Sequence, residues 1–172
     1  MVNINADQNP EYVNSFLDYS LTILNKSPNS VKEYNYDLTM FLRYIKIQYH
    51  LTNETDFKSI TIKDIPLDVI KKITPQDIMS FLSFMALNLK AKAATRARKI
   101  STIRIFFSYL SQKAKIIDNN PAQNIETPKK EKRMPRYLTL DDSKKLLNVT
   151  MDENDENKER DYAIITIFLN CG

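Results

Sequence analysis

Residues 92–110 read KAATRARKISTIRIFFSYL, and this is the most informative stretch of the chain. Its apolar residues recur at helical spacing and predict a helix from Lys92 to Gln112. The expected core stripe of this helix is Ala93, Ala97, Ile100, Ile103, Phe107 and Leu110. Polar residues spaced i, i+3, i+4 and i+7 share a different face, namely Thr95, Arg98, Lys99 and Thr102. One face of the helix is therefore expected to pack, and the other to be polar and basic.

A basic segment bracketed by proline, TPKKEKRMPR, follows at residues 127–136. Residues 90–136 hold 13 basic and 3 acidic side chains, a local net charge of +10, whereas all other positions hold 12 basic and 18 acidic, a net charge of −6. A chain polarised in this way presents a positive surface that attracts a polyanion. A solvated basic helix and linker is the alternative. The clustering of charge over both segments, with Thr and Ser interleaved, favours nucleic acid.

Composition excludes several other classes of protein. The length of 172 residues fits one domain, or one domain and part of another, and no apolar run is long enough to span a bilayer. No signal-peptide pattern opens the chain, and a cytoplasmic location is expected. A single cysteine, Cys171, and a single histidine, His50, exclude an internal disulfide and a His/Cys metal site. The one glycine, Gly172, excludes a glycine-rich phosphate loop.

The remaining N-terminal patterns predict three more helices. The first is expected from about Pro10 to Asn25, and the second from a Ser27-Pro28 start to about Tyr49. Thr74-Pro75 predicts the start of a third. Between them, residues 50–73 are less regular. Apolar residues alternate there at Ile60, Ile62 and Ile65, which permits a short extended piece but predicts no sheet.

A new unit is expected after the basic segment. Thr139, followed three residues later by Asp142, predicts a capped helix that ends near Val149. The last helix, expected from Arg160 to Asn170, is apolar nearly all round and must be buried on several sides. We therefore expect either that the polypeptide is truncated at Gly172 or that another chain supplies the missing cover. The whole chain is expected to be all-α.

The chain resembles the N-terminal part of tyrosine recombinases, the phage-integrase family that includes the Xer-type enzymes. The stretches that carry the resemblance are SPNSVKEYNYDLTMFLRYI, ITPQDIMSFLSFM, ATRARKISTIRIFFSYLSQKAKIIDNNPAQNI with TPKKEKRMPRYLTLDDSKKLL, and ERDYAIITIFLNCG. They follow in the family's order from about Glu11 to Gly172. The resemblance implies a core-binding (SAM-like) bundle of four to five helices at 1–126, a basic interdomain linker at 127–136, and the first helices of a truncated catalytic domain at 137–172.

The resemblance also implies a DNA-binding surface. In the family the two domains clamp duplex DNA, and the second and fourth helices address the major groove. The matching positions are Ser30, Lys32 and Tyr36 on the second helix and Thr95, Arg98, Lys99 and Thr102 on the fourth. Arg98 and Lys99 are the expected base readers, because such side chains reach guanine O6 and N7. Linker cations are expected to neutralise phosphates; they are Lys129, Lys130, Lys132, Arg133 and Arg136. Arg96 stands where the family has an apolar residue, and it either contacts phosphate or extends to solvent.

No catalytic residue is assigned in this chain. The family's chemistry needs a tyrosine nucleophile, two arginines, a lysine and histidines, and the first of those arginines comes just after a glycine placed like Gly172. The tyrosines that lie in apolar helical patterns are read as core: Tyr34, Tyr44, Tyr109 and Tyr162. The resemblance implies a parent enzyme that cuts and rejoins DNA through a 3′-phosphotyrosyl link, without ATP or an obligatory metal, as a tetramer on DNA. The chain itself is expected to bind duplex DNA and to cut nothing.

Two other readings stay open. One is a non-catalytic DNA-binding regulator built on the same helical domain. The other is an all-α protein-interaction module whose basic face meets an acidic protein. Neither a membrane nor a small-molecule substrate is expected as a partner.

Overall fold

The computed structural model describes residues 6–129, 137–151 and 156–171. Within these ranges the regular elements are helices and no strand occurs, so the predicted all-α class is confirmed. None of the helices there is long and apolar enough to cross a membrane. The chain divides into two compact units, Met1–Glu131 and Lys132–Gly172, here called the first and the second unit.

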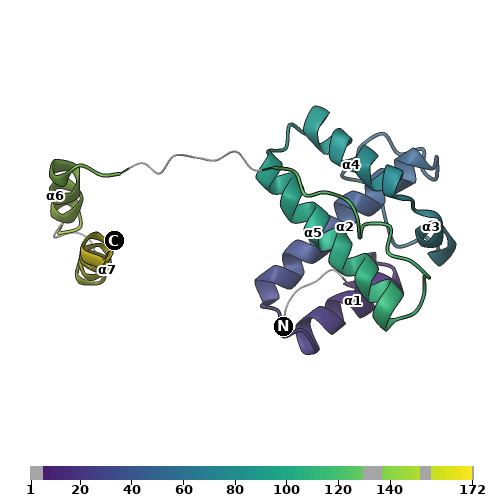
Figure 1. The fold of residues 1–172 in the computed structure, drawn as a ribbon, viewed down its shortest axis with the longest axis horizontal. Coiled ribbons are helices and arrows are strands. Elements are labelled where there is room, and N and C mark those ends of the chain that lie inside the picture. The colour runs from purple at the N-terminus through teal and green to yellow at the C-terminus, as the bar shows by residue number, and fades with distance from the viewer. Residues whose placement is uncertain (1–5, 130–136, 152–155, 172) are drawn as a thin grey trace. The chain divides into compact units, whose positions relative to one another are not determined.

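The first unit contains five α-helices and two shorter helical pieces (Figure 1). They are η1 (Ala6–Gln8), α1 (Glu11–Thr22), α2 (Pro28–Gln48), α3 (Leu67–Lys72), α4 (Pro75–Leu87), α5 (Ala93–Ser108) and the π-helical turn η2 (Tyr109–Lys113). The second unit contains α6 (Leu140–Val149) and α7 (Lys158–Cys171), which pack against each other.

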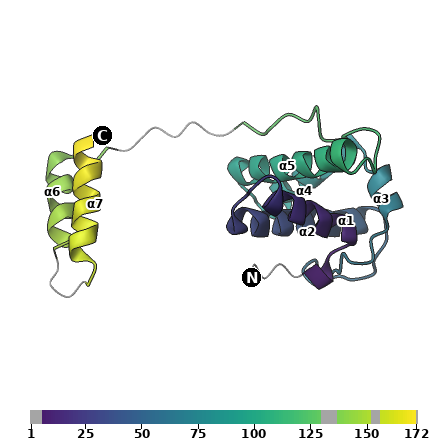
Figure 2. The same ribbon diagram turned by 90° about the horizontal axis from the view of Figure 1, so that it is seen from below.

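The long helices α2 and α5 lie side by side at the centre of the first unit, with α1 packed on α2 and α4 on both (Figure 2). A row of aromatic rings joins these four helices. Phe16 of α1 lies 5.4 Å from Phe106 of α5, Phe106 lies 5.4 Å from Phe107, Phe107 lies 6.2 Å from Phe41 of α2, and Phe41 lies 5.3 Å from Phe81 of α4. All five rings are fully buried. Each such pair adds about 0.5–1.5 kcal/mol to the stabilisation from burial alone, so the row fixes the helices relative to one another.

Three predicted helix starts are confirmed by their capping hydrogen bonds. The Ser27 hydroxyl accepts from the amide of the third residue of α2 at 3.2 Å. Thr74 and Asp77 form a reciprocal capping box at the start of α4, with distances of 3.3 and 2.8 Å. Thr139 accepts from the amide three residues on at 3.1 Å. Because a cap satisfies amides that the first turn leaves free, these signals act locally and can be read from sequence.

The segment between α2 and α4 forms no sheet within the described residues, as expected, but it contains a short helix that the sequence did not predict. Its regular part is a helix, α3, and no extended strand forms in it. The alternating Ile60, Ile62 and Ile65 are all buried. Ile62 and Ile65 belong to the hydrophobic core cluster. The first helix also ends earlier than expected, at Thr22. The backbone then turns through Asn25, whose φ of 48° lies in a region that asparagine tolerates better than most residues.

The predicted core stripe of the fourth helix is confirmed except at its first position. Ala97, Ile100, Ile103, Phe107 and Leu110 are buried, whereas Ala93 is half-buried. The stripe also missed Phe106, which is fully buried. The reason is that α5 packs against more than one neighbour, so it buries two adjacent faces instead of one.

The last helix keeps exposed apolar residues, in agreement with the expectation that cover for it is missing. Ile167 and Phe168 of α7 are 61% and 74% exposed. Among the described residues of the second unit α7 packs on α6, and a helix that is apolar nearly all round keeps much of its apolar surface exposed when one helix covers it.

Candidate nucleic-acid interface

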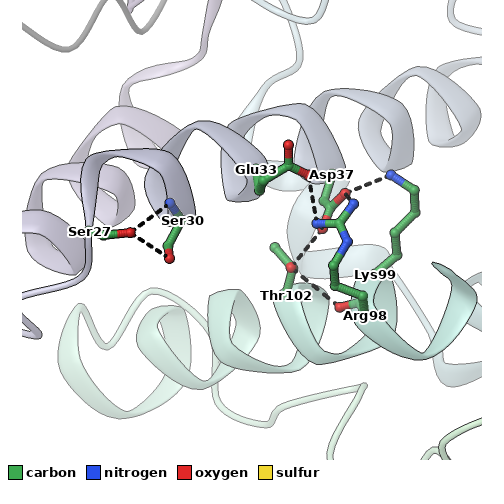
Figure 3. Close-up of polar contacts among 7 residues, drawn as sticks. All are labelled: Ser27, Ser30, Glu33, Asp37, Arg98, Lys99 and Thr102. Carbon is green, nitrogen blue, oxygen red and sulfur yellow. Dashed lines mark hydrogen bonds and ion pairs between the residues drawn. The ribbon is translucent and has the colours of Figure 1, made fainter. Parts of the chain in front are cut away.

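The polar faces of α2 and α5 meet at one buried carboxylate, Asp37 (Figure 3). The Arg98 guanidinium donates to both of its oxygens, from Nη1 at 2.7 Å and from Nη2 at 2.8 Å. Lys99 Nζ donates to Oδ1 at 2.6 Å, and the Thr102 hydroxyl donates to Oδ2 at 2.8 Å. Three of the four polar residues predicted to share a face of α5 therefore converge on a single acid of α2.

Two further residues complete this group. Glu33, one turn before Asp37, lies 3.1 Å from Arg98 Nη1. Lys99 Nζ lies 4.6 Å from the centre of the Tyr36 ring, a cation–π distance. We call Glu33, Tyr36, Asp37, Arg98, Lys99 and Thr102 the Asp37 cluster. It holds two cations and two carboxylates, and this balance is what allows charged groups to lie in the interior.

Burial divides the α5 members of the cluster into two kinds. Lys99 and Thr102 are buried at 2% and 1% exposure, and their polar atoms are engaged with Asp37. The side chain of Arg98 is 42% exposed, so it reaches the surface while it is held from below. That Lys99 reads a base and that Thr102 belongs to the DNA-binding face stay predictions. In the conformation described here they face the protein interior, and only Arg98 of the three presents charge to a ligand.

Sequence reasoning did not include Asp37 among the functional residues. The signal was present, because Asp37 lies three residues after Tyr34 and four before Phe41, on the apolar stripe of α2. An acid on a core stripe is rare unless it is paired. That pattern alone would have predicted a buried cationic partner, although not which one.

The other expected site residues lie in different surroundings. Lys32 and Thr95 are exposed, Tyr36 is 57% exposed, and Ser30 is half-buried beside the cap of α2. Arg96 is half-buried, and its Nη1 donates to the carbonyl of Ala91; the two roles expected for Arg96 stay predictions. Lys129 is exposed. The remaining linker cations lie outside the described residues; they are Lys130, Lys132, Arg133 and Arg136.

The tyrosines read as core mostly occupy it. Tyr44 is buried, and Tyr34 and Tyr109 pack against the core, whereas Tyr162 is 38% exposed. Burial is the largest cause that raises the pKa of Tyr44 and Tyr109 above the ordinary value, as it is for Tyr12. A raised pKa leaves a phenol less ready to form the phenolate, which agrees with packing roles for these side chains.

The described parts of the chain contain no group of three or more His, Cys, Asp or Glu side chains placed to hold a metal ion. His50 and Cys171 are both exposed, and they lie on different units.

Comparison with known proteins gives the chain clear relatives. It is 43% identical over 164 residues to the tyrosine recombinase XerC of Caldanaerobacter subterraneus subsp. tengcongensis, which is 95% of this chain and 46% of that protein. It is 30% identical over 158 residues to a tyrosine recombinase of Pseudothermotoga lettingae, 92% of the chain and 47% of that protein. It is 29% identical over 162 residues to the tyrosine recombinase XerD of Listeria monocytogenes serotype 4b, 94% of the chain and 48% of that protein.

The chain thus spans about half the length of the curated relatives that it matches. Neither a family model nor a solved structure matches it.

Proposed function

Because the chain belongs to the Xer-like tyrosine recombinases over nearly all of its length, we propose that it is the DNA-binding part of a site-specific recombinase. The observation that carries the proposal is the Asp37 cluster. It ties α2 to α5 and holds Arg98 at the surface. The same two helices carry the exposed residues Lys32, Tyr36 and Thr95. A guanidinium held by two hydrogen bonds loses little further freedom when it binds a ligand.

Each member of the surface has a role in this proposal. Arg98 reads a base edge in the major groove, because a guanidinium bonds to guanine O6 and N7 together. Lys32, Tyr36 and Thr95 contact bases or phosphates beside it. Lys99 and Thr102 act from below, by fixing Asp37 and through it Arg98. Glu33 is the ligand's competitor: its side chain is 60% exposed, and a phosphate or base edge that reaches Arg98 displaces it.

The remaining parts of the proposal concern the whole protein. The linker cations Lys129, Lys130, Lys132, Arg133 and Arg136 neutralise phosphates without reading sequence. The parent enzyme breaks and rejoins DNA through a 3′-phosphotyrosyl intermediate, as a tetramer on DNA, and needs no ATP. This chain contributes DNA binding and does not itself cut DNA.

The experiment that tests the proposal measures fluorescence anisotropy of the whole chain with a pool of short duplexes, at several salt concentrations, and recovers the bound sequences. Arg98→Ala is expected to cost about 1–3 kcal/mol of binding free energy and to relax the sequence preference. Lys130→Ala is expected to weaken all sequences alike and to lower the salt slope by about 0.9.

The Arg98→Ala variant is expected to fold. Arg98→Ala leaves Asp37 paired with Lys99 and Thr102, so no buried charge loses its last partner. Lys71→Ala is the matched control, because Lys71 is an exposed cation that is likewise paired with an acid of its own unit. No binding of the unaltered chain at low salt, or equal binding by all three variants, would show that the proposed surface is wrong.

A further inference from the structure

A hollow of about 570 Å³ opens beside the Asp37 cluster, between α2 and residues 58–62. Three cationic side chains line it, Lys32 and Arg43 from α2 and Lys58 from the segment that precedes α3, and no acidic side chain does. Tyr36 also lines the hollow and contacts Lys99 of the cluster, so the hollow is continuous with the candidate interface. A concavity lined by charge of one sign concentrates ions of the other sign.

The cations of the hollow have few partners within the protein. Across the described residues, none of Lys32, Arg43 and Lys58 has a carboxylate within ion-pair distance. Arg43 Nε donates to the carbonyl of Ile60 at 2.9 Å, which holds the far wall against α2. Asp56 is an acid two positions before Lys58. Hydrogen bonds from Ser59 and the Lys58 amide, with a smaller effect of the Lys58 charge, lower the pKa of that carboxyl.

Several of the neutral polar side chains of the hollow are engaged within the protein. The Asn9 amide donates to Asn35 at 2.8 Å, the Thr39 hydroxyl donates to the Asn35 carbonyl at 2.8 Å, and the Ser59 hydroxyl donates to Asp56 at 2.6 Å. What sets the hollow apart is its positive charge, because three cations and no acid line it. Such a site suits a phosphate group.

We propose that this hollow binds a backbone phosphate of the DNA duplex that α2 and α5 contact, with Lys58 and Arg43 as phosphate-binding residues. The inference depends on the proposed function and extends it, because it adds residues 58–62 to a surface otherwise built from two helices. A phosphate held there fixes the register of the duplex on α2 and carries no sequence information. Substitution of Lys58 is expected to leave the fold intact, since its side chain makes no hydrogen bond within the described residues.

The test compares Lys58→Ala with Lys63→Ala in the full chain, using the duplex recovered above or any duplex that binds. Lys63 is an exposed lysine five residues further along the same segment, and it does not line the hollow. Loss of one phosphate contact lowers the salt slope by about 0.9, which corresponds to roughly eightfold weaker binding at 0.1 M salt. Lys58→Ala is expected to show this loss with unchanged sequence preference, and Lys63→Ala a change below about twofold.

A second arm locates the phosphate. Duplexes that carry a single neutral methylphosphonate are scanned along each strand with the unaltered chain and with Lys58→Ala. The proposal expects one position at which neutralisation weakens the unaltered chain and no longer weakens the variant, because both changes remove the same contact.

The outcomes separate the two proposals. If Arg98→Ala weakens binding while Lys58→Ala matches Lys63→Ala, the hollow does not bind DNA and the proposed function stands. If inorganic phosphate shifts the amide resonance of Lys58 and the duplex does not, the hollow is a site for a free anion and the inference is wrong. If the unaltered chain binds no duplex, the proposed function fails and this inference fails with it.

Discussion

Replacing Asp37 by alanine is expected to destabilise the first unit more than replacing any other acidic residue of that unit by alanine. The Asp37 side chain is fully buried and accepts hydrogen bonds from Arg98, Lys99 and Thr102. The three partners lose different amounts of stabilising interaction when Asp37 is removed. Arg98 is 42% exposed and keeps Glu33, whereas Lys99 is left in the interior with only the Tyr36 ring beside its ammonium group.

The magnitude follows from these differences. An ammonium left buried without its carboxylate costs about 3–5 kcal/mol. The hydrogen bond lost by Thr102 adds about 1 kcal/mol, and the partly exposed Arg98 pair adds about 1 kcal/mol or less. Since Lys99 relaxes partly toward solvent, we expect a total near 4 kcal/mol, against a free energy of unfolding of about 5–15 kcal/mol for an ordinary domain.

Urea denaturation followed by tyrosine fluorescence measures this loss, because seven of the nine tyrosines lie in the first unit. Asp68→Ala is the control: Asp68 is 82% exposed and its 3.8 Å pair with Lys71 is expected to be worth about 0.5 kcal/mol or less. Asp37→Leu combined with Lys99→Met removes both buried charges and is expected to recover most of the loss. A cost below about 1 kcal/mol for Asp37→Ala, or no recovery in the double variant, would refute the reasoning.

Two further predictions concern the ends of α2 and α4. Thr74→Ala removes the side-chain acceptor of the capping box and is expected to cost about 1 kcal/mol in the same urea assay, whereas Thr61→Ala, at an exposed threonine outside any helix, is expected to cost little. Tyr49 donates to Asp77 at 3.0 Å, and burial together with that carboxylate raises its pKa from 10.0 to about 12. A raised folded-state pKa means that the stability contributed by Tyr49 is complete below pH 10 and is lost as pH rises toward about 12. The free energy of unfolding should therefore fall less steeply with rising pH in Tyr49→Phe than in the unaltered protein across that window. Identical slopes in the two proteins would count against the raised pKa of Tyr49.

The features that the sequence predicted well are those that depend on residues only a few positions apart. The starts of α2, α4 and α6 follow from Ser27, Thr74 and Thr139, because a cap bonds to amides only two or three positions away. The stripe on α5 follows from spacing alone. Residues 50–73 were not predicted in detail, since a helix as short as α3 makes too few turns to show a period.

The candidate site was predicted only in part, for a different reason. Spacing shows that Arg98, Lys99 and Thr102 share a face, but it cannot show whether that face meets water or an acid. The acid is Asp37, 61 positions before Arg98 in sequence. Lys32 and Arg43 of the hollow share α2, but Lys58 joins them only through the packing of α2 against the segment before α3.

The Asp37 cluster also bears on how proteins of this kind can diverge. Lys99 and Thr102 are buried against Asp37, so a change at either position requires a matching change on the neighbouring helix. Lys32 and Thr95 are exposed and have no such partner within the described residues, so they are free to vary one at a time. Under the proposed function, relatives that acquire new target sequences should differ first at these exposed positions, while positions 37, 99 and 102 change together or not at all.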